Sequence, residues 1–109
     1  MALILLMSQL SRAADSEGRY IILGQGGVSC GTVVDEYDKD GLGRLTHSAW
    51  IQGYLTAINE EIYPGKNVTG STDPDARMRW IYNYCKKNPL DILHKATNAL
   101  LQELKLRSR

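Results

Sequence analysis

The sequence predicts a small all-α domain of four helices that is cross-linked by one disulfide bond and preceded by an extended N-terminal segment. Three observations support this prediction: apolar residues recur at helical spacing, prolines and capping residues mark helix starts, and the chain has one pair of cysteines. The 109 residues, 43% of them hydrophobic, suffice for one folded domain and not for two. Phenylalanine is absent, so two tryptophans and six tyrosines supply the aromatic packing.

Residues 1–13 are interpreted as the end of a secretory signal peptide, which leaves residues 14–109 as the single helical domain. Residues 2–10 are mostly apolar, and Ser11 and Ala13 are the small residues expected before a cut. The apolar stretch of about nine residues is much shorter than the roughly 20 that a membrane-spanning helix needs. No basic residue precedes it, which favours an initiator upstream of Met1, and an amphipathic or core helix is the alternative interpretation.

The cysteines Cys30 and Cys85 fit an exported protein. An even number of cysteines in a short secreted chain favours a disulfide. A disulfide across this separation should raise the free energy of the unfolded chain by about 4 kcal/mol, because it restricts the conformations of that chain. A reactive thiol pair would have the closer Cys-x-x-Cys spacing, and a metal site would need clustered histidines, whereas His47 and His94 stand apart.

The mature chain is expected to start as an extended segment and then to form its first helix. Residues 14–29 contain the apolar run Tyr20-Ile21-Ile22-Leu23 followed by glycines, which predicts extended chain and a flexible turn. Ser29 stands where the N-cap of a helix from Cys30 to about Tyr37 would be.

The second helix has a strong helical pattern of apolar residues. Thr46 is its expected N-cap, and Leu45 would pack against Trp50 as a hydrophobic staple. Gly53 is interpreted as a point where another backbone comes close. Pro64 and the following glycine end the helix. Its buried face is expected to contain Ala49, Trp50, Tyr54, Ala57, Ile58 and Ile62.

Two more helices are predicted after the polar loop that ends at Ser71. Thr72 is the expected cap of the third helix, with Pro74 in its first turn. Asn88 and Pro89 are expected to end this helix and to start the fourth. The apolar stripe of the third helix consists of Met78, Ile81, Tyr84 and Cys85, with Trp80 beside it. The stripe of the fourth consists of Leu90, Leu93, Ala96, Thr97, Leu100 and Leu104.

Residues 38–46 have some features of a calcium-binding loop. Asp38 and Asp40 occupy the first and third ligand positions, and Gly43 occupies the sharp-turn position. Leu42 and Ala49, however, stand where an oxygen ligand and a bidentate glutamate are needed. We therefore expect a polar loop between helices, with no calcium, no other metal and no cofactor.

No arrangement of catalytic residues is predicted, so the chain is not expected to be an enzyme. His47 and His94 form no recognisable catalytic arrangement with a serine or cysteine nucleophile and are expected at the surface or in first helical turns. Glu60 and Glu61 would point about 100° apart on a helix, which favours a solvated face over an acid–base pair. Residues 67–69 form a glycosylation sequon, which has no meaning in a bacterial periplasm.

The composition favours another protein as the partner. Thirteen basic residues against 12 acidic ones leave no basic surface of the size that nucleic acid requires. Tryptophan and tyrosine dominate the energetics of protein interfaces. Most aromatic rings of the two central helices should pack in the core, and the exposed ones are candidates for protein binding: Trp50, Tyr54, Trp80 and Tyr84.

Several of these residues together resemble the HdeA/HdeB family of periplasmic acid-stress chaperones. In that family one cysteine opens a helix, a Gly-aromatic-x-x-Ala-aliphatic-Asn helix follows, and a second cysteine closes a later helix. Cys30, the stretch GYLTAIN at 53–59, Ile81 and Cys85 match this pattern within about residues 29–107. The segment between Cys30 and Gly53 is longer than in the family, and the aromatic stretch 80–89 is not part of the family pattern.

The resemblance implies an exported helical domain with Cys30 and Cys85 as its structural bridge. Such proteins form homodimers at neutral pH, come apart in acid and bind unfolding clients through newly exposed apolar surface. The chain is also similar in size, helical makeup and disulfide to the Rap/Tai-type immunity proteins of type VI secretion, which implies stoichiometric neutralisation of a cell-wall-cutting toxin. We therefore expect a periplasmic stress chaperone, with an immunity protein as the alternative.

The charge balance is compatible with activation in acid. Without residues 1–13 the chain has 12 basic and 12 acidic residues and is neutral at pH 7. When its carboxylates are protonated and both histidines are charged, the side chains carry +14. Self-repulsion of this size favours loosening of a small domain, which the disulfide would keep from opening fully.

Overall fold

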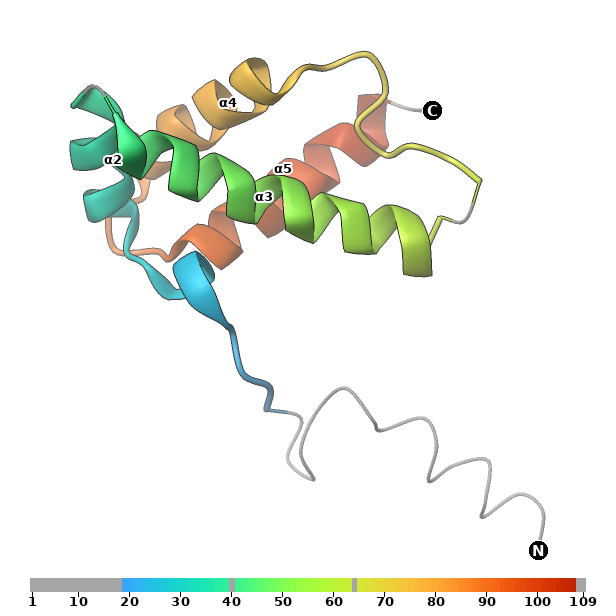
Figure 1. Ribbon diagram of the computed structural model, residues 1–109, viewed down its shortest axis with the longest axis horizontal. Helices are drawn as coiled ribbons and strands as arrows, with labels where there is room; N and C mark the ends of the chain where they lie inside the picture. Colours follow the sequence, from blue (N-terminus) through green and yellow to red (C-terminus); the bar gives the residue numbers. More distant parts are fainter. Residues whose placement is uncertain (1–18, 40, 64, 108–109) are drawn as a thin grey trace, which may run out of the picture.

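The computed structural model describes residues 19–39, 41–63 and 65–107. Within these ranges the chain forms a short 3-10 helix, η1 (Gly24–Gly27), and the helices α2 (Cys30–Asp38), α3 (Leu42–Glu61), α4 (Pro74–Lys87) and α5 (Leu93–Arg107) (Figure 1). The prediction of a four-helix, all-α domain is therefore confirmed. The predicted signal peptide lies outside the described residues. No described helix combines the length and the apolarity needed to cross a bilayer.

The short helix α2 lies at one end of the three longer helices (Figure 1). Its predicted cap is confirmed, because the Ser29 hydroxyl oxygen accepts a hydrogen bond from the Thr32 amide at 3.1 Å. The start of α4 is also as predicted, although the cap is one residue later. The Asp73 carboxylate accepts from the Ala76 amide at 2.8 Å, while Thr72 Oγ1 donates to the Thr69 carbonyl.

The start of α3 differs from the prediction. The helix begins at Leu42, four residues before the expected cap Thr46. Gly41 precedes it with φ of 134°, a conformation that favours glycine and reverses the chain directly into the helix. Thr46 is thus inside the helix, and its hydroxyl donates to the Leu42 carbonyl at 2.7 Å.

The buried face of α3 is offset from the predicted one. Its buried residues are His47, Ile51 and Leu55, which recur every four positions. Trp50, Tyr54 and Ile58 border this face and are half-buried, whereas Ala49, Ala57 and Ile62 are exposed. Two neighbouring stripes of α3 contain apolar residues, and the one with the branched aliphatic side chains at 51 and 55 packs against the core.

The start of α5 also differs from the prediction. Pro89 and Leu90 form a turn, and Leu90 is 95% exposed instead of buried. The helix begins at Leu93, whose amide donates to the Val28 carbonyl at 2.8 Å. The Cys30 amide likewise donates to the Asp91 carbonyl at 2.7 Å. These long-range bonds hold the start of α5 beside the start of α2.

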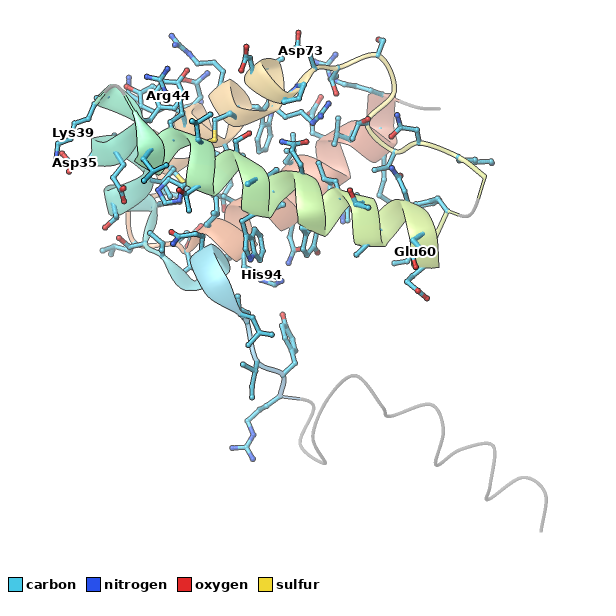
Figure 2. All side chains as sticks on the ribbon, in the orientation of Figure 1. Asp35, Lys39, Arg44, Glu60, Asp73 and His94 are labelled. Atoms are coloured by element: carbon cyan, nitrogen blue, oxygen red, sulfur yellow. A yellow bond between two sulfur atoms is a disulfide. The ribbon has the colours of Figure 1, made fainter. Side chains whose placement is uncertain are left out.

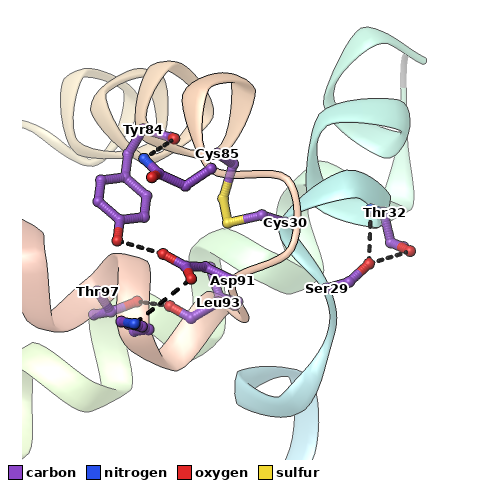
Figure 3. Close-up of a disulfide and its surroundings, with 10 residues drawn as sticks. Ser29, Cys30, Thr32, Tyr84, Cys85, Asp91, Leu93 and Thr97 are labelled. Atoms are coloured by element: carbon purple, nitrogen blue, oxygen red, sulfur yellow. Dashed lines mark hydrogen bonds and ion pairs between the residues drawn. A yellow bond between two sulfur atoms is a disulfide. The ribbon is translucent and has the colours of Figure 1, made fainter.

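The disulfide between Cys30 and Cys85 is present and joins α2 to α4 (Figure 3). Both cysteines are fully buried, and their Cα atoms are 4.7 Å apart. They belong to the main apolar core, which also contains Val33, Ile51, Leu55, Met78, Ile81, Leu93, Ala96, Leu100, Leu101 and Leu104. The predicted disulfide is thus confirmed as part of the core.

Candidate functional site: an apolar groove

An open cavity of about 450 Å³ lies between the extended N-terminal segment and the helices α3 and α5. We call it the apolar groove. In its wall, Tyr20, Ile21 and Leu23 keep 59%, 84% and 75% of their surface exposed. Residues of this type are normally covered when they are contiguous, so the groove is a candidate binding surface. Its lining consists of Tyr20, Ile21, Ile22, Leu23, Trp50, Gly53, Tyr54 and His94.

The floor of the groove is formed by aromatic rings from α3 and α5. Trp50 and Tyr54, one turn apart on α3, stack with their ring centroids 5.5 Å apart. The imidazole of His94 meets both edge-on, at 6.1 Å from Trp50 and 5.7 Å from Tyr54. Tyr20 adds a fourth ring, 5.8 Å from His94. Such edge-on and offset contacts are the preferred geometries of aromatic pairs.

The N-terminal wall is attached to this floor through Trp50. The indole Nε1 donates a hydrogen bond to the Leu23 carbonyl at 2.8 Å. Gly26 of η1 lies directly against the indole, because a Cβ placed there would approach Trp50 to 2.3 Å. The glycine turn that was predicted to be flexible is therefore a 3-10 helix packed on Trp50. Gly53 faces open space and not a neighbouring backbone, which corrects the second glycine prediction.

The described lining of the groove has no carboxylate, ammonium or guanidinium group. Burial lowers the pKa of His94, which favours the neutral imidazole. Burial also raises the pKa of Tyr54, and the hydroxyl of this residue donates to Asn98 Oδ1. At neutral pH the groove therefore presents uncharged rings and aliphatic side chains.

The four predicted binding residues separate into two pairs. Trp50 and Tyr54 lie together in the groove, whereas Trp80 and Tyr84 stack on α4, with ring centroids 5.9 Å apart. Trp80 borders another cavity of about 190 Å³ that buried Arg77 also lines. The Tyr84 hydroxyl donates to Asp91 Oδ2 at 2.6 Å, which raises the pKa of Tyr84. Tyr84 is thus tied into the fold near the disulfide (Figure 3).

Sequence reasoning did not identify His94 or the wall residues Ile21 and Leu23 as parts of the site. The contact between the N-terminal segment and α3 joins residues 27 positions apart, and no local sequence pattern predicts it. The apolar run at 20–23, next to glycines and ahead of the first helix, was the available signal.

The other histidine, His47, is only 1% exposed, which contradicts the predicted surface position. Its Nε2 atom lies 3.3 Å from Glu36 Oε1, without the alignment of a hydrogen bond. The imidazole occupies a core-facing position of α3, one turn before Ile51, and the helix register places it there. The surface expectation failed because it assumed that α3 begins at Thr46, which would leave His47 in an exposed first turn.

Most of the segment 38–46, which was expected to be a polar loop, belongs to helices. Asp38 is the last residue of α2, and its carboxylate accepts from the Tyr82 hydroxyl at 2.8 Å. Gly43 is already inside α3. Asp40 lies outside the described residues. Over the described parts of the chain, no three histidine, cysteine, aspartate or glutamate side chains gather as metal ligands.

The remaining candidate residues lie at the far end of α3. Glu60 and Glu61 are exposed, as expected of a solvated face. Asn67 of the sequon is exposed, and its Oδ1 atom accepts from Asn59 Nδ2 at 3.0 Å and from Thr69 Oγ1 at 2.7 Å. These hydrogen bonds stabilise the loop that follows α3.

No protein-family model, no curated protein and no solved structure matches this chain. The class that the fold and groove define is thus a disulfide-linked all-α domain with an open apolar groove.

Proposed function

We propose that this chain is an exported protein-binding domain that holds apolar segments of other polypeptides in its groove, in the manner of a periplasmic stress chaperone. The observation that carries the proposal is the groove itself. The mostly exposed Ile21 and Leu23 of its wall and the rings of Trp50 and Tyr54 at its floor line one open cavity. A concave apolar surface with a few polar groups is the common form of a binding site in proteins.

The disulfide supports the exported location. A buried cross-link between α2 and α4 fits an oxidising compartment, and the periplasm is the one we propose. The bridge also limits how far the domain can open under stress, because the two helices stay joined at their buried cysteines.

The chemistry of the groove defines what it would hold. Trp50 and Tyr54 offer flat rings to aliphatic and aromatic side chains, and neutral His94 adds no charge at neutral pH. A cavity of about 450 Å³ accommodates a few side chains of an exposed segment and not a folded domain. Unfolding clients expose such segments. Accumulated positive charge in acid would loosen the helices around the groove and enlarge the apolar surface.

The test is suppression of aggregation of an acid-labile dehydrogenase at about pH 2–3, where acid unfolding exposes its core. The groove variant Ile21→Ser/Leu23→Ser should lose most of the suppression that the parent chain provides. Its matched control is Leu90→Ser/Leu106→Ser, which removes two leucines that are 95% and 57% exposed away from the groove lining. The proposal fails if the parent chain leaves precipitation unchanged, or if both variants lose suppression equally.

One observation favours a second candidate, an immunity-type protein that binds one specific partner stoichiometrically. The groove is open in the folded state, with Trp50 bonded to Leu23, so binding would need no prior loosening in acid. This candidate predicts a defined 1:1 or 2:2 complex at neutral pH, measured by light scattering after size-exclusion chromatography. Client protection that occurs in acid alone, without such a complex, would exclude it.

A further inference from the structure

Away from the groove lining, cationic side chains gather over two stacked tyrosines. Tyr37 of α2 and Tyr82 of α4 have ring centroids 4.2 Å apart and an angle of 26° between their planes. The Arg44 guanidinium lies 4.3 Å from the Tyr37 centroid, and Lys86 Nζ lies 5.1 Å from that of Tyr82. Arg79 is close to both rings, at 5.8 and 5.5 Å. We call these five residues the tyrosine–cation surface.

This surface and the groove are separate. Arg44 and His94, which mark the two sites, lie on opposite sides of α3 in the view of Figure 2. No residue of the tyrosine–cation surface lines the groove. A partner could therefore occupy one site without covering the other.

The cations of the surface exceed the acids that contact it in the described structure. Asp38 contacts it through the Tyr82 hydroxyl. Of the neighbouring acids, Asp35 pairs with Lys39 at 2.9 Å, and Glu36 Oε1 lies 3.3 Å from Nε2 of the buried His47. A local excess of positive charge thus arises on a chain whose total charge is nearly balanced.

The two tyrosine rings hold the cations in a defined arrangement. Cation–π contacts orient a guanidinium over an aromatic face. One nitrogen of Arg44 donates to the Tyr37 carbonyl at 2.5 Å, and one nitrogen of Arg79 donates to the Tyr37 hydroxyl at 3.3 Å. A guanidinium has five N–H donors, so exposed Arg79 keeps donors for a further acceptor. Lys86 is exposed as well.

We propose that the tyrosine–cation surface binds an acidic segment of a partner polypeptide. Arginine forms paired, charge-assisted hydrogen bonds with carboxylates, and a nearby lysine adds attraction without directional demands. Complementary charge of this kind steers a partner and sets its orientation. The inference is independent of the groove and of the chaperone proposal.

Other anionic partners fit this surface less well. Segments that bind anionic bilayers have about 4–8 clustered lysines and arginines, more than the three present here. Nucleic-acid binding draws on many phosphate contacts and a strongly basic surface, which a chain of charge +1 does not have. Carboxylates on a polypeptide need only the few donors that this surface provides.

The probe is a short fluorescein-labelled peptide of alternating glutamate and glycine. Its binding is measured by fluorescence anisotropy at pH 7 and low salt. The same peptide with glutamine in place of glutamate is the uncharged control. We expect Arg79→Gln/Lys86→Gln to weaken binding of the glutamate peptide by about tenfold or more. Lys66→Gln/Lys95→Gln, which removes two exposed cations elsewhere, should leave binding nearly unchanged. Raising salt from about 0.05 to 0.5 M should weaken binding by the parent chain.

Several results would overturn the proposal. Equal weakening by the two double variants would show that overall charge, and not this surface, attracts the peptide. Equal affinity for the glutamine peptide would show that carboxylates are not recognised. If the parent chain bound phosphatidylglycerol vesicles or a single-stranded oligonucleotide more tightly than the glutamate peptide, the surface would be assigned to a different partner. All of these tests use the intact chain, and near-UV circular dichroism checks the fold of each variant.

Discussion

The region around the disulfide, which we call the corner, and the apolar groove both contain apolar side chains, but these side chains differ in how far they are exposed. At the corner, Cys30, Cys85 and Leu93 are 0% exposed and are surrounded by backbone bonds between the starts of α2 and α5. At the groove, Ile21 and Leu23 keep most of their surface in contact with solvent. The difference teaches that apolar side chains at the corner stabilise the fold, while those of the groove wall are available to a partner. Substitutions at the corner should therefore lower stability, whereas substitutions in the groove wall should weaken binding.

The largest effect is expected at the disulfide. Cys30→Ser/Cys85→Ser should lower the free energy of unfolding by about 4 kcal/mol, because the unfolded chain regains the freedom that the bridge removes. Urea denaturation of parent and variant measures the difference. A loss below about 1 kcal/mol would mean that the corner does not hold the domain together.

A smaller loss should distinguish the observed core face of α3 from the predicted one. Leu55→Ala, at a position that is 1% exposed, should cost about 3 kcal/mol. Ala57→Ser, on the face that the sequence pattern favoured, should change the free energy of unfolding by less than about 0.5 kcal/mol, because Ala57 is exposed. Thermal and urea denaturation of the two variants test the helix register, and a reversed order of the losses would contradict it.

The predictions from sequence succeeded where the signals are local. Ser29 caps α2 as predicted, and Pro74 lies in the first turn of α4 as predicted, although the cap is Asp73 and not Thr72. The start of α3 was missed because Gly41 permits a backbone conformation, at φ of 134°, that composition does not reveal.

The groove depends on contacts between distant parts of the chain. The bond from Trp50 to Leu23 and the approach of His94 to Tyr54 join α3 to segments far from it in sequence. The sequence identified Trp50 and Tyr54 as binding candidates by residue type alone. It could not show that these two rings meet His94 in one groove, apart from Trp80 and Tyr84.

An intermediate effect is expected at the hydrogen bond beside the corner. Tyr84→Phe removes the bond to Asp91 and should lower the free energy of unfolding by about 1–2 kcal/mol at pH 7. The bond raises the pKa of Tyr84 in the fold, so its contribution is complete below the unfolded tyrosine pKa near 10.0 and is lost as pH rises through the folded value. Unfolding of parent and variant from pH 8 to strongly alkaline pH should therefore converge, and a constant difference would contradict this linkage.

The contribution of His94 in the groove to stability should depend on pH in the direction opposite to that of Tyr84. Burial lowers the pKa of His94 below 6.5, so the unfolded chain takes up this proton more readily than the fold does. The contribution of the neutral imidazole is present above pH 6.5 and is lost as pH falls through the folded pKa. His94→Gln should therefore lose less thermal stability than the parent between about pH 7.5 and 5. Parallel melting curves for both proteins would contradict this assignment.

The groove wall should have the smallest effect on stability and a large effect on binding. Ile21→Ser/Leu23→Ser should change the free energy of unfolding by less than about 0.5 kcal/mol, because both side chains are mostly exposed. Urea denaturation at neutral pH measures this change. A loss comparable to that of Leu55→Ala would mean that the groove wall is part of the core.

The fluorescence of single-tryptophan variants tests the central claim most directly. Trp80→Phe leaves Trp50 in the groove as the reporter, and Trp50→Phe leaves Trp80 on α4. When an unfolding client is added, the emission of Trp50 should shift to shorter wavelength as the client covers the groove, while the emission of Trp80 stays nearly constant. A shift at Trp80 without one at Trp50, under conditions where the client is held in solution, would contradict binding in the groove.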